Sequence, residues 1–185
     1  MNIKSVCIES ILQNHYGVKK VILKNDRIAG GYTVASDSEY LVFESLTISG
    51  KKAFGKLIGL LRDMEYILGG RYHAAPWVAR LKEIASKRWN VYDNAAIEQA
   101  VPEKPFTSLE CIMRNQFGIK KVFLNRPKHY GQRVGGDIEY DYFTRAGGRV
   151  YEQLVKLIYA LGELFGSGFD TCFIVGTLDN IVMEI

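Results

Sequence analysis

The sequence predicts an α+β protein formed by tandem duplication of a helix–antiparallel strands–helix unit, with a helical spacer between the copies. The segment NHYGVKKVIL recurs as NQFGIKKVFL 101 positions later. Further glycines and leucines recur at an offset of 97, and each copy passes from helical to alternating periodicity and back. The predicted boundaries are 1–75 for the first repeat, 76–106 for the spacer and 107–185 for the second repeat.

Apolar residues at helical spacing predict the helix that opens each copy. In the first copy they span 3–14, and Gly17 stands where a residue in the left-handed conformation ends a helix. In the second copy Thr107 or Ser108 is expected to cap the helix, with Glu110 completing a capping box.

Strands and a second helix follow in each copy. The branched and aromatic residues of VKKVILK and IKKVFLN predict the first strands, 18–24 and 119–125. Further strands are predicted at 31–36, 39–48 and 138–145. Gly50 and Gly148 each precede an amphipathic pattern, which predicts helices over 51–68 and 149–165.

The spacer and the carboxyl end complete the predicted architecture. Pro76 suits the first turn of a helix, and Asp93 is a candidate cap for the helical segment NAAIEQAV. The last segment, CFIVGTLDNIVMEI, predicts a terminal hairpin that turns at 178–180. Its edge could close the sheet of its own repeat or pair with a second copy of the chain, so homo-oligomer formation stays open.

Composition indicates a soluble cytoplasmic protein. Of the residues, 48% are apolar and 24% are charged, with a net charge of +4, and neither a secretory signal nor a membrane span is expected. The three cysteines are far apart, which favours free thiols in a reducing compartment over disulfides or a zinc site. Cys7 and Cys111 lie on apolar helix faces and are expected in the core.

The repeated lysine pair has two interpretations. Lys19 and Lys20, like Lys120 and Lys121, could simply cover the surface beside the carboxyl end of the preceding helix. Alternatively, both copies present a basic spot at equivalent places and bind phosphates. The sequence leaves both interpretations open.

Other basic residues favour the phosphate interpretation. Three lysines open the second helix of the first copy, where backbone N–H groups attract anions. In the second copy, eight of nine basic residues lie within 114–149. The candidate nucleic-acid-binding residues are therefore Lys19, Lys20, Lys51, Lys52, Lys56, Lys120, Lys121, Arg126, Lys128 and Arg133.

Catalytic chemistry has little support. The sequence contains no GxxxxGK[ST], HExxH or GxSxG motif, and its three histidines are isolated. Asp137, Glu139 and Asp141 alternate along a predicted strand, but they lack the nearby histidine or second carboxylate cluster that a metal or acid–base site would use. We therefore predict no catalytic residues, no metal and no cofactor.

Two functions remain from the sequence. The first is a non-enzymatic accessory protein that grips the phosphates of DNA or RNA through basic residues in both repeats. The alternative is a protein-binding module or inhibitor that uses the pseudosymmetric surface of the duplicated domains. An exposed apolar patch near Trp77, Trp89 and Tyr92 would favour the protein partner.

Overall fold

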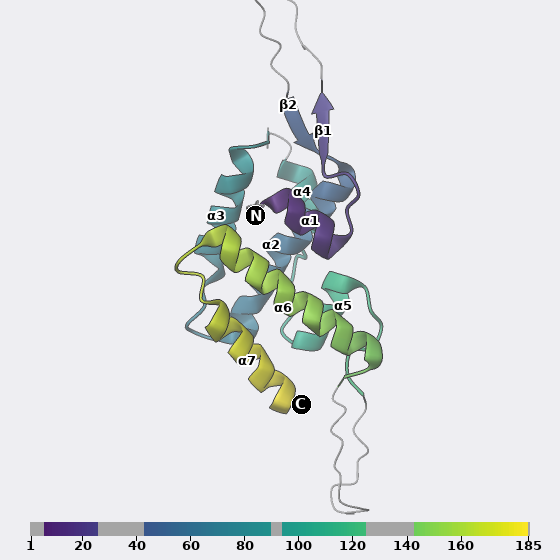
Figure 1. The fold of residues 1–185 in the computed structure, drawn as a ribbon, viewed down its shortest axis with the longest axis vertical. Coiled ribbons are helices and arrows are strands. Elements are labelled where there is room, and N and C mark those ends of the chain that lie inside the picture. The colour runs from purple at the N-terminus through teal and green to yellow at the C-terminus, as the bar shows by residue number, and fades with distance from the viewer. Residues whose placement is uncertain (1–5, 26–42, 90–93, 125–142, 185) are drawn as a thin grey trace, which may run out of the picture. The chain divides into compact units, whose positions relative to one another are not determined.

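The computed structural model describes residues 6–25, 43–89, 94–124 and 143–184, and leaves 1–5, 26–42, 90–93, 125–142 and 185 undescribed. Within the described part, seven helices accompany a two-stranded antiparallel sheet, which confirms the α+β class (Figure 1). The chain forms two compact units. Unit 1 comprises Met1–Arg62 and His73–Lys104, and unit 2 comprises Asp63–Tyr72 and Pro105–Ile185.

Unit 1 contains a two-stranded antiparallel sheet and most of the first long helix. Its elements are α1 (Ile8–Tyr16), β1 (Ile22–Asn25), β2 (Phe43–Leu46), the first part of α2 (Ile48–Leu68), α3 (Ala74–Ser86) and α4 (Asn94–Ala100). Strand β1 pairs with β2 in an antiparallel register that places Ile22 opposite Leu46. The helices predicted in the spacer are therefore present as α3 and α4.

The described part of unit 2 is mostly helical. It contains α5 (Leu109–Phe117), α6 (Arg145–Phe165) and α7 (Thr171–Glu184), together with the end of α2. An isolated antiparallel bridge joins Phe123 to Phe143. These two residues lie 101 positions after Ile22 and 97 after Leu46, so the bridge falls at the offsets of the sequence repeat.

The helix stop predicted at Gly17 is confirmed, and Gly118 ends the matching helix of unit 2. Gly17 ends α1 with φ 65° and Gly118 ends α5 with φ 71°, both in the left-handed region that favours glycine. The Gly17 N–H donates to Gln13 O at 3.2 Å, and the Gly118 N–H donates to Arg114 O at 2.9 Å, which is the backbone bond of an αL cap. Helices α1 and α5 therefore end in the same way, because each is followed by a glycine that can adopt the left-handed conformation.

The helix starts differ from the prediction. Residues 6 and 7 are not helical, so α1 begins later than the periodicity over 3–14 indicated. Ser108 rather than Thr107 caps α5, since its Oγ accepts the Cys111 N–H at 3.2 Å. With the cap at Ser108, Cys111 occupies the third helical position, and the predicted capping box with Glu110 does not form.

The first strand starts later than predicted. β1 begins at Ile22, so Lys19 and Lys20 precede the strand instead of lying in it. In the second copy, the described residues contribute only the Phe123–Phe143 bridge. The strand predicted at 31–36 lies outside the described residues, as do 39–42 of the strand predicted at 39–48 and 138–142 of the strand predicted at 138–145. Within 39–48, residues Phe43–Leu46 form β2.

The terminal hairpin prediction is wrong, because residues Thr171–Glu184 form helix α7. Branched residues in this segment favour strands locally. However, Ile174, Leu178 and Val182 recur four apart and are all buried, so burial of one helical stripe outweighs that preference. Asp170 supports the helix start by accepting the Phe173 N–H at 2.9 Å.

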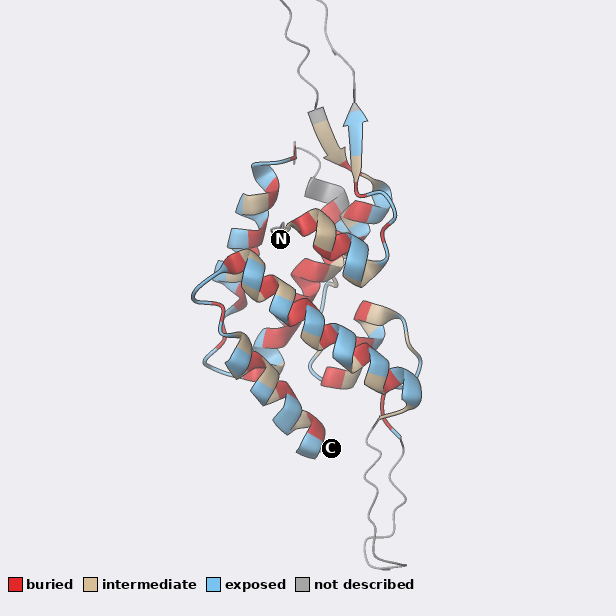
Figure 2. Cartoon of the chain, in the orientation of Figure 1, coloured by how far each residue is buried: buried red, intermediate tan, exposed pale blue. Residues whose placement is uncertain are grey.

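Both long helices contribute buried side chains to the core, and α2 is buried on more than one face. On α2 the buried residues include Phe54, Leu57 and Leu61, and on α6 they include Leu154 and Leu157 (Figure 2). Burying side chains of this size stabilises a fold by roughly 1.5–3 kcal/mol each. The long helices are therefore the elements on which the shorter ones of their units pack.

Unit 2 also buries a carboxyl group. Asp63 is only 1% exposed, and its Oδ1 accepts the Phe106 N–H at 2.9 Å, whereas Oδ2 is buried without a hydrogen-bond partner among the described residues. Burial raises the pKa of Asp63 to about 6, and the bond from Phe106 opposes this shift. Asp63 thus attaches the segment before α5 to α2.

Asp63 makes stability depend on pH. Because its pKa is higher in the folded than in the unfolded protein, its stabilising contribution is complete below about pH 4 and is lost as the pH rises through about 6. This difference corresponds to roughly 3 kcal/mol. We predict that Asp63→Asn, which keeps an acceptor for Phe106, flattens the dependence of the unfolding free energy on pH between about 4 and 7.

Denaturant titrations at several pH values measure this effect. Asp170→Asn is the control, since Asp170 also accepts a backbone N–H but is exposed. An unchanged pH dependence in Asp63→Asn would show that Asp63 does not control it.

Candidate nucleic-acid interface

Both lysine pairs lie just after a helix-ending glycine and are exposed. Lys19 and Lys20 follow Gly17, and Lys120 and Lys121 occupy the matching places in unit 2. None of the four lies within a strand or helix. Their side chains therefore project from the connection between a helix and the first extended segment.

In unit 1 a threonine fixes the backbone of this connection. The Thr47 hydroxyl donates to Lys20 O at 2.6 Å, and the Thr47 N–H donates to Val21 O at 2.8 Å. The same hydroxyl oxygen accepts the Gly50 N–H at 3.0 Å. Thr47 thus caps α2 and holds the end of the lysine pair against the first turn of that helix.

Unit 2 contains the same arrangement. The Thr144 hydroxyl donates to Lys121 O at 2.9 Å, and the Thr144 N–H donates to Val122 O at 2.9 Å. The Thr144 oxygen accepts the Gly147 N–H at 2.9 Å. We call each arrangement a threonine junction, defined by residues 20, 21, 47 and 50 in unit 1 and by 121, 122, 144 and 147 in unit 2.

A glycine is required in the first helical turn of each junction. A Cβ added to Gly50 would lie 2.8 Å from Val21 O, and one added to Gly147 would collide with Val122 O. The carbonyl groups can approach the helix only because these positions have no side chain. This also corrects the predicted helix starts, since Gly50 and Gly148 lie within the first turns of α2 and α6 instead of before them.

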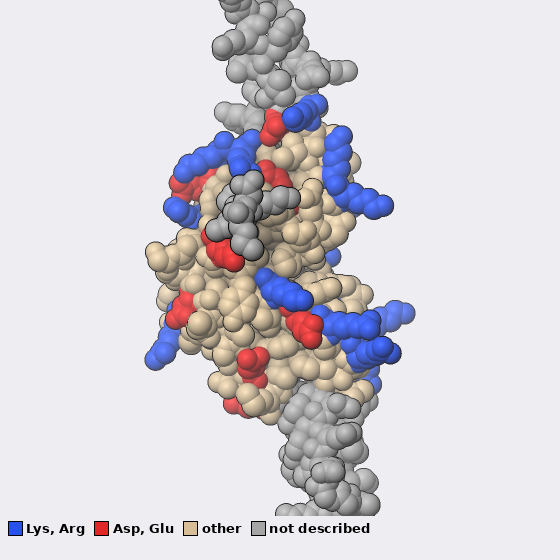
Figure 3. Space-filling view, in the orientation of Figure 1, with Lys and Arg blue, Asp and Glu red and all other residues tan. Residues whose placement is uncertain are grey.

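Basic side chains stand at the start of both long helices. On α2, Lys52 is exposed, while Lys51 and Lys56 are half-buried. On α6, Arg145 and Arg149 are exposed. Figure 3 shows Lys and Arg side chains, with acidic ones among them, gathered over α5 and the start of α6.

Arg149 was not among the candidate residues. It lies 97 positions after Lys52, the same offset that relates Thr144 to Thr47. The 97-residue offset between the second helices could have identified Arg149 from the sequence. It was missed because AGGRV contains no lysine cluster like that of GKKAF. Beside each threonine junction there is therefore a lysine pair and an exposed basic residue at the same helical position, Lys52 in α2 and Arg149 in α6.

The backbone N–H groups at the starts of α2 and α6 contribute less to anion binding than the sequence suggested. The N–H groups of Gly50 and Gly147 already donate to the capping threonines, so these two donors are not offered to an anion. Binding at a junction would therefore depend on the side chains. Arg126, Lys128 and Arg133, the other predicted contacts, lie outside the described residues.

Among the described residues, the two cysteines predicted in the core form no reactive or metal-binding cluster. Cys111 is exposed, so its predicted core position is wrong, because Leu109, Ile112 and Met113 form the buried face of α5. Cys7 is half-buried, and no three metal-binding side chains group together in the part that the structure describes. The carboxylates at 137, 139 and 141 lie outside that part.

Comparisons with known proteins do not add to this. No protein-family model, curated protein or solved structure matches the chain. Among the described helices, none has both the length and the apolar character needed to cross a membrane.

Two neighbouring glycines in the first turn of α6 test the threonine junction of unit 2. Gly147→Ala should destabilise the protein because its Cβ would collide with Val122 O. Gly148→Ala is the matched control, since its Cβ would meet Phe143 Cβ at an ordinary 3.8 Å. The control should stabilise the helix by up to about 1 kcal/mol, as alanine is the better helix former.

Urea unfolding of both variants measures the difference. Equal effects of the two substitutions would contradict the close approach of Val122 to α6.

Proposed function

We propose that the protein is a non-enzymatic nucleic-acid-binding accessory protein that contacts phosphates through its two threonine junctions. The observation that carries this proposal is the recurrence of an exposed lysine pair on an anchored backbone, next to an exposed base on the following helix. Lysine binds a phosphate as a mobile point charge, so contacts of this kind position a nucleic acid without reading its bases.

We also propose that the chain arose by tandem duplication. Helices α1 and α5 have 9 residues each, and α2 and α6 have 21 each. After the long helices, Tyr72 N–H donates to Gly69 O and Phe169 N–H to Gly166 O, again 97 positions apart. The same offset relates the first residues of α3 and α7, which supports extending the first repeat beyond the predicted boundary at 75 to include α3.

The protein-partner alternative receives less support. An exposed apolar patch around Trp89 would have favoured a protein partner, but Trp89 is 3% exposed and packs edge-on against Phe54 at 6.0 Å. Trp77 is half-buried, and Tyr92 lies outside the described residues. A cytoplasmic location remains part of the proposal and rests on the three free cysteines.

Binding across a salt series tests the proposed function. Labelled single- and double-stranded DNA and RNA should bind at low salt, with an affinity that falls steeply as salt rises. We predict that Lys19→Glu with Lys20→Glu, and separately Lys120→Glu with Lys121→Glu, weakens binding at least about tenfold and lowers the salt slope by up to about two.

The charge-matched control is Lys104→Glu with Lys156→Glu, which reverses two exposed lysines away from the junctions. If the protein does not bind at low salt, or if this control loses as much affinity as the junction variants, the proposed function is wrong.

A further inference from the structure

Unit 1 contains a cavity of about 560 Å³ between α2, α3 and α4. Its floor is one stripe of α2 in which Phe54, Ile58 and Arg62 recur four apart. Ala79 and Ala85 on α3 leave space because their side chains are short. Cavities of roughly 300–1,000 Å³ commonly hold small molecules.

Two glycines fix the α4 wall of this cavity. A Cβ on Gly55 would lie 2.9 Å from Ile97 O, and a Cβ on Gly59 would lie 3.0 Å from Pro102 Cδ. The chain at and after α4 can thus pack directly against the backbone of α2. The wall is therefore held by close packing.

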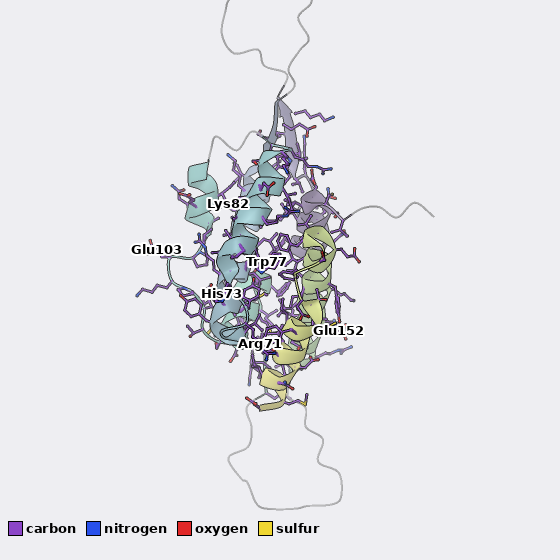
Figure 4. The ribbon with its side chains drawn as sticks, turned by 90° about the vertical axis from the view of Figure 1, so that its left-hand side faces the viewer. Arg71, His73, Trp77, Lys82, Glu103 and Glu152 are labelled. Carbon is purple, nitrogen blue, oxygen red and sulfur yellow. The ribbon has the colours of Figure 1, made fainter. Side chains whose placement is uncertain are left out.

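Unit 2 carries different residues on the equivalent stripe of its long helix. At 97 positions after the two glycines, α6 has Glu152 and Lys156, and both are exposed (Figure 4 labels Glu152). Long charged side chains at these places would prevent the close packing seen at Gly55 and Gly59. The glycines that allow α4 and the residues after it to pack closely are thus present in α2 and absent at the matching positions of α6.

The mouth of the cavity has an excess of positive charge. Arg62 from α2 and Lys82 from α3 have no ion pair among the described residues, and Figure 4 shows Lys82 on α3. Glu83 is already engaged by Lys87 at 2.8 Å and by Arg80 at 3.7 Å. Glu98 on α4 has no ion pair among the described residues, and of the acidic groups that line the cavity it is the one left to oppose the two bases.

We infer that this cavity binds a small amphipathic monoanion, whose apolar body lies on Phe54, Ile58 and Ile97 and whose carboxylate is held by Arg62 and Lys82. A guanidinium can bind a carboxylate through two parallel hydrogen bonds, and the nearby ammonium adds a second charge. Glu98 would repel a second negative charge on the ligand, which favours a monoanion over a dianion. This inference is independent of the proposed nucleic-acid binding.

Trp89 offers a direct readout, because its ring packs at 6.0 Å against Phe54 on the cavity floor. The chain has two tryptophans, so Trp77→Phe leaves Trp89 as the single reporter. We predict a saturable change in Trp89 fluorescence when decanoate is added. Decan-1-ol and decylammonium, which lack the carboxylate, should bind at least about tenfold more weakly.

Variants in the Trp77→Phe protein separate the two parts of the site. Arg62→Gln with Lys82→Gln should weaken decanoate binding at least about tenfold without changing the affinity for decan-1-ol. Ala79→Phe, at an exposed position on the cavity wall, should fill the space and abolish binding of both compounds. Lys156→Gln on α6 is the control and should change neither.

Isothermal titration calorimetry provides a second measure of binding, and far-UV circular dichroism shows whether each variant folds. The inference is overturned if decanoate gives no saturable signal by either method. It is also overturned if decan-1-ol binds as tightly as decanoate, or if folded Ala79→Phe protein binds as well as its parent. Nucleic-acid binding of Ala79→Phe should equal that of its parent, so the two proposals fail separately.

Discussion

In each unit, one threonine hydroxyl links the first turn of the long helix to the segment that contains the lysine pair. In both units it accepts an N–H from a first-turn glycine and donates to the carbonyl of a lysine. One side chain therefore caps the long helix and fixes the chain that leads into the extended segment. Loss of a capping hydroxyl typically costs about 1 kcal/mol, and here it would also release the lysine carbonyl.

This constraint supports the proposed contact of the lysine pairs with phosphates. The backbone of Lys20 and Lys121 is anchored, whereas all four lysine side chains are exposed. Contacts made from an anchored backbone lose less conformational entropy on binding than contacts made from a flexible tail. The cavity lies farther along the same helix, at Phe54, Ile58 and Arg62, so the two proposed binding sites use different turns of α2.

The features predictable from sequence were those with a local cause. Gly17 and Gly118 end their helices because each glycine itself supplies the left-handed conformation. The junctions could not be predicted in this way, since the Thr47 hydroxyl bonds to a carbonyl 27 positions away. Helix α7 was missed for a related reason: its branched residues favour a strand locally, and only burial against the rest of unit 2 selects the helix.

The central claim is that both junctions contact the same class of ligand in the same way. An NMR titration of the isotope-labelled protein with a short oligonucleotide at low salt tests this most directly. Our account predicts shifts in the backbone signals of residues 19–21 and 120–122, together with those of Lys52 and Arg149, that disappear when salt is raised. Shifts confined to other surfaces, or to one junction alone, would contradict it.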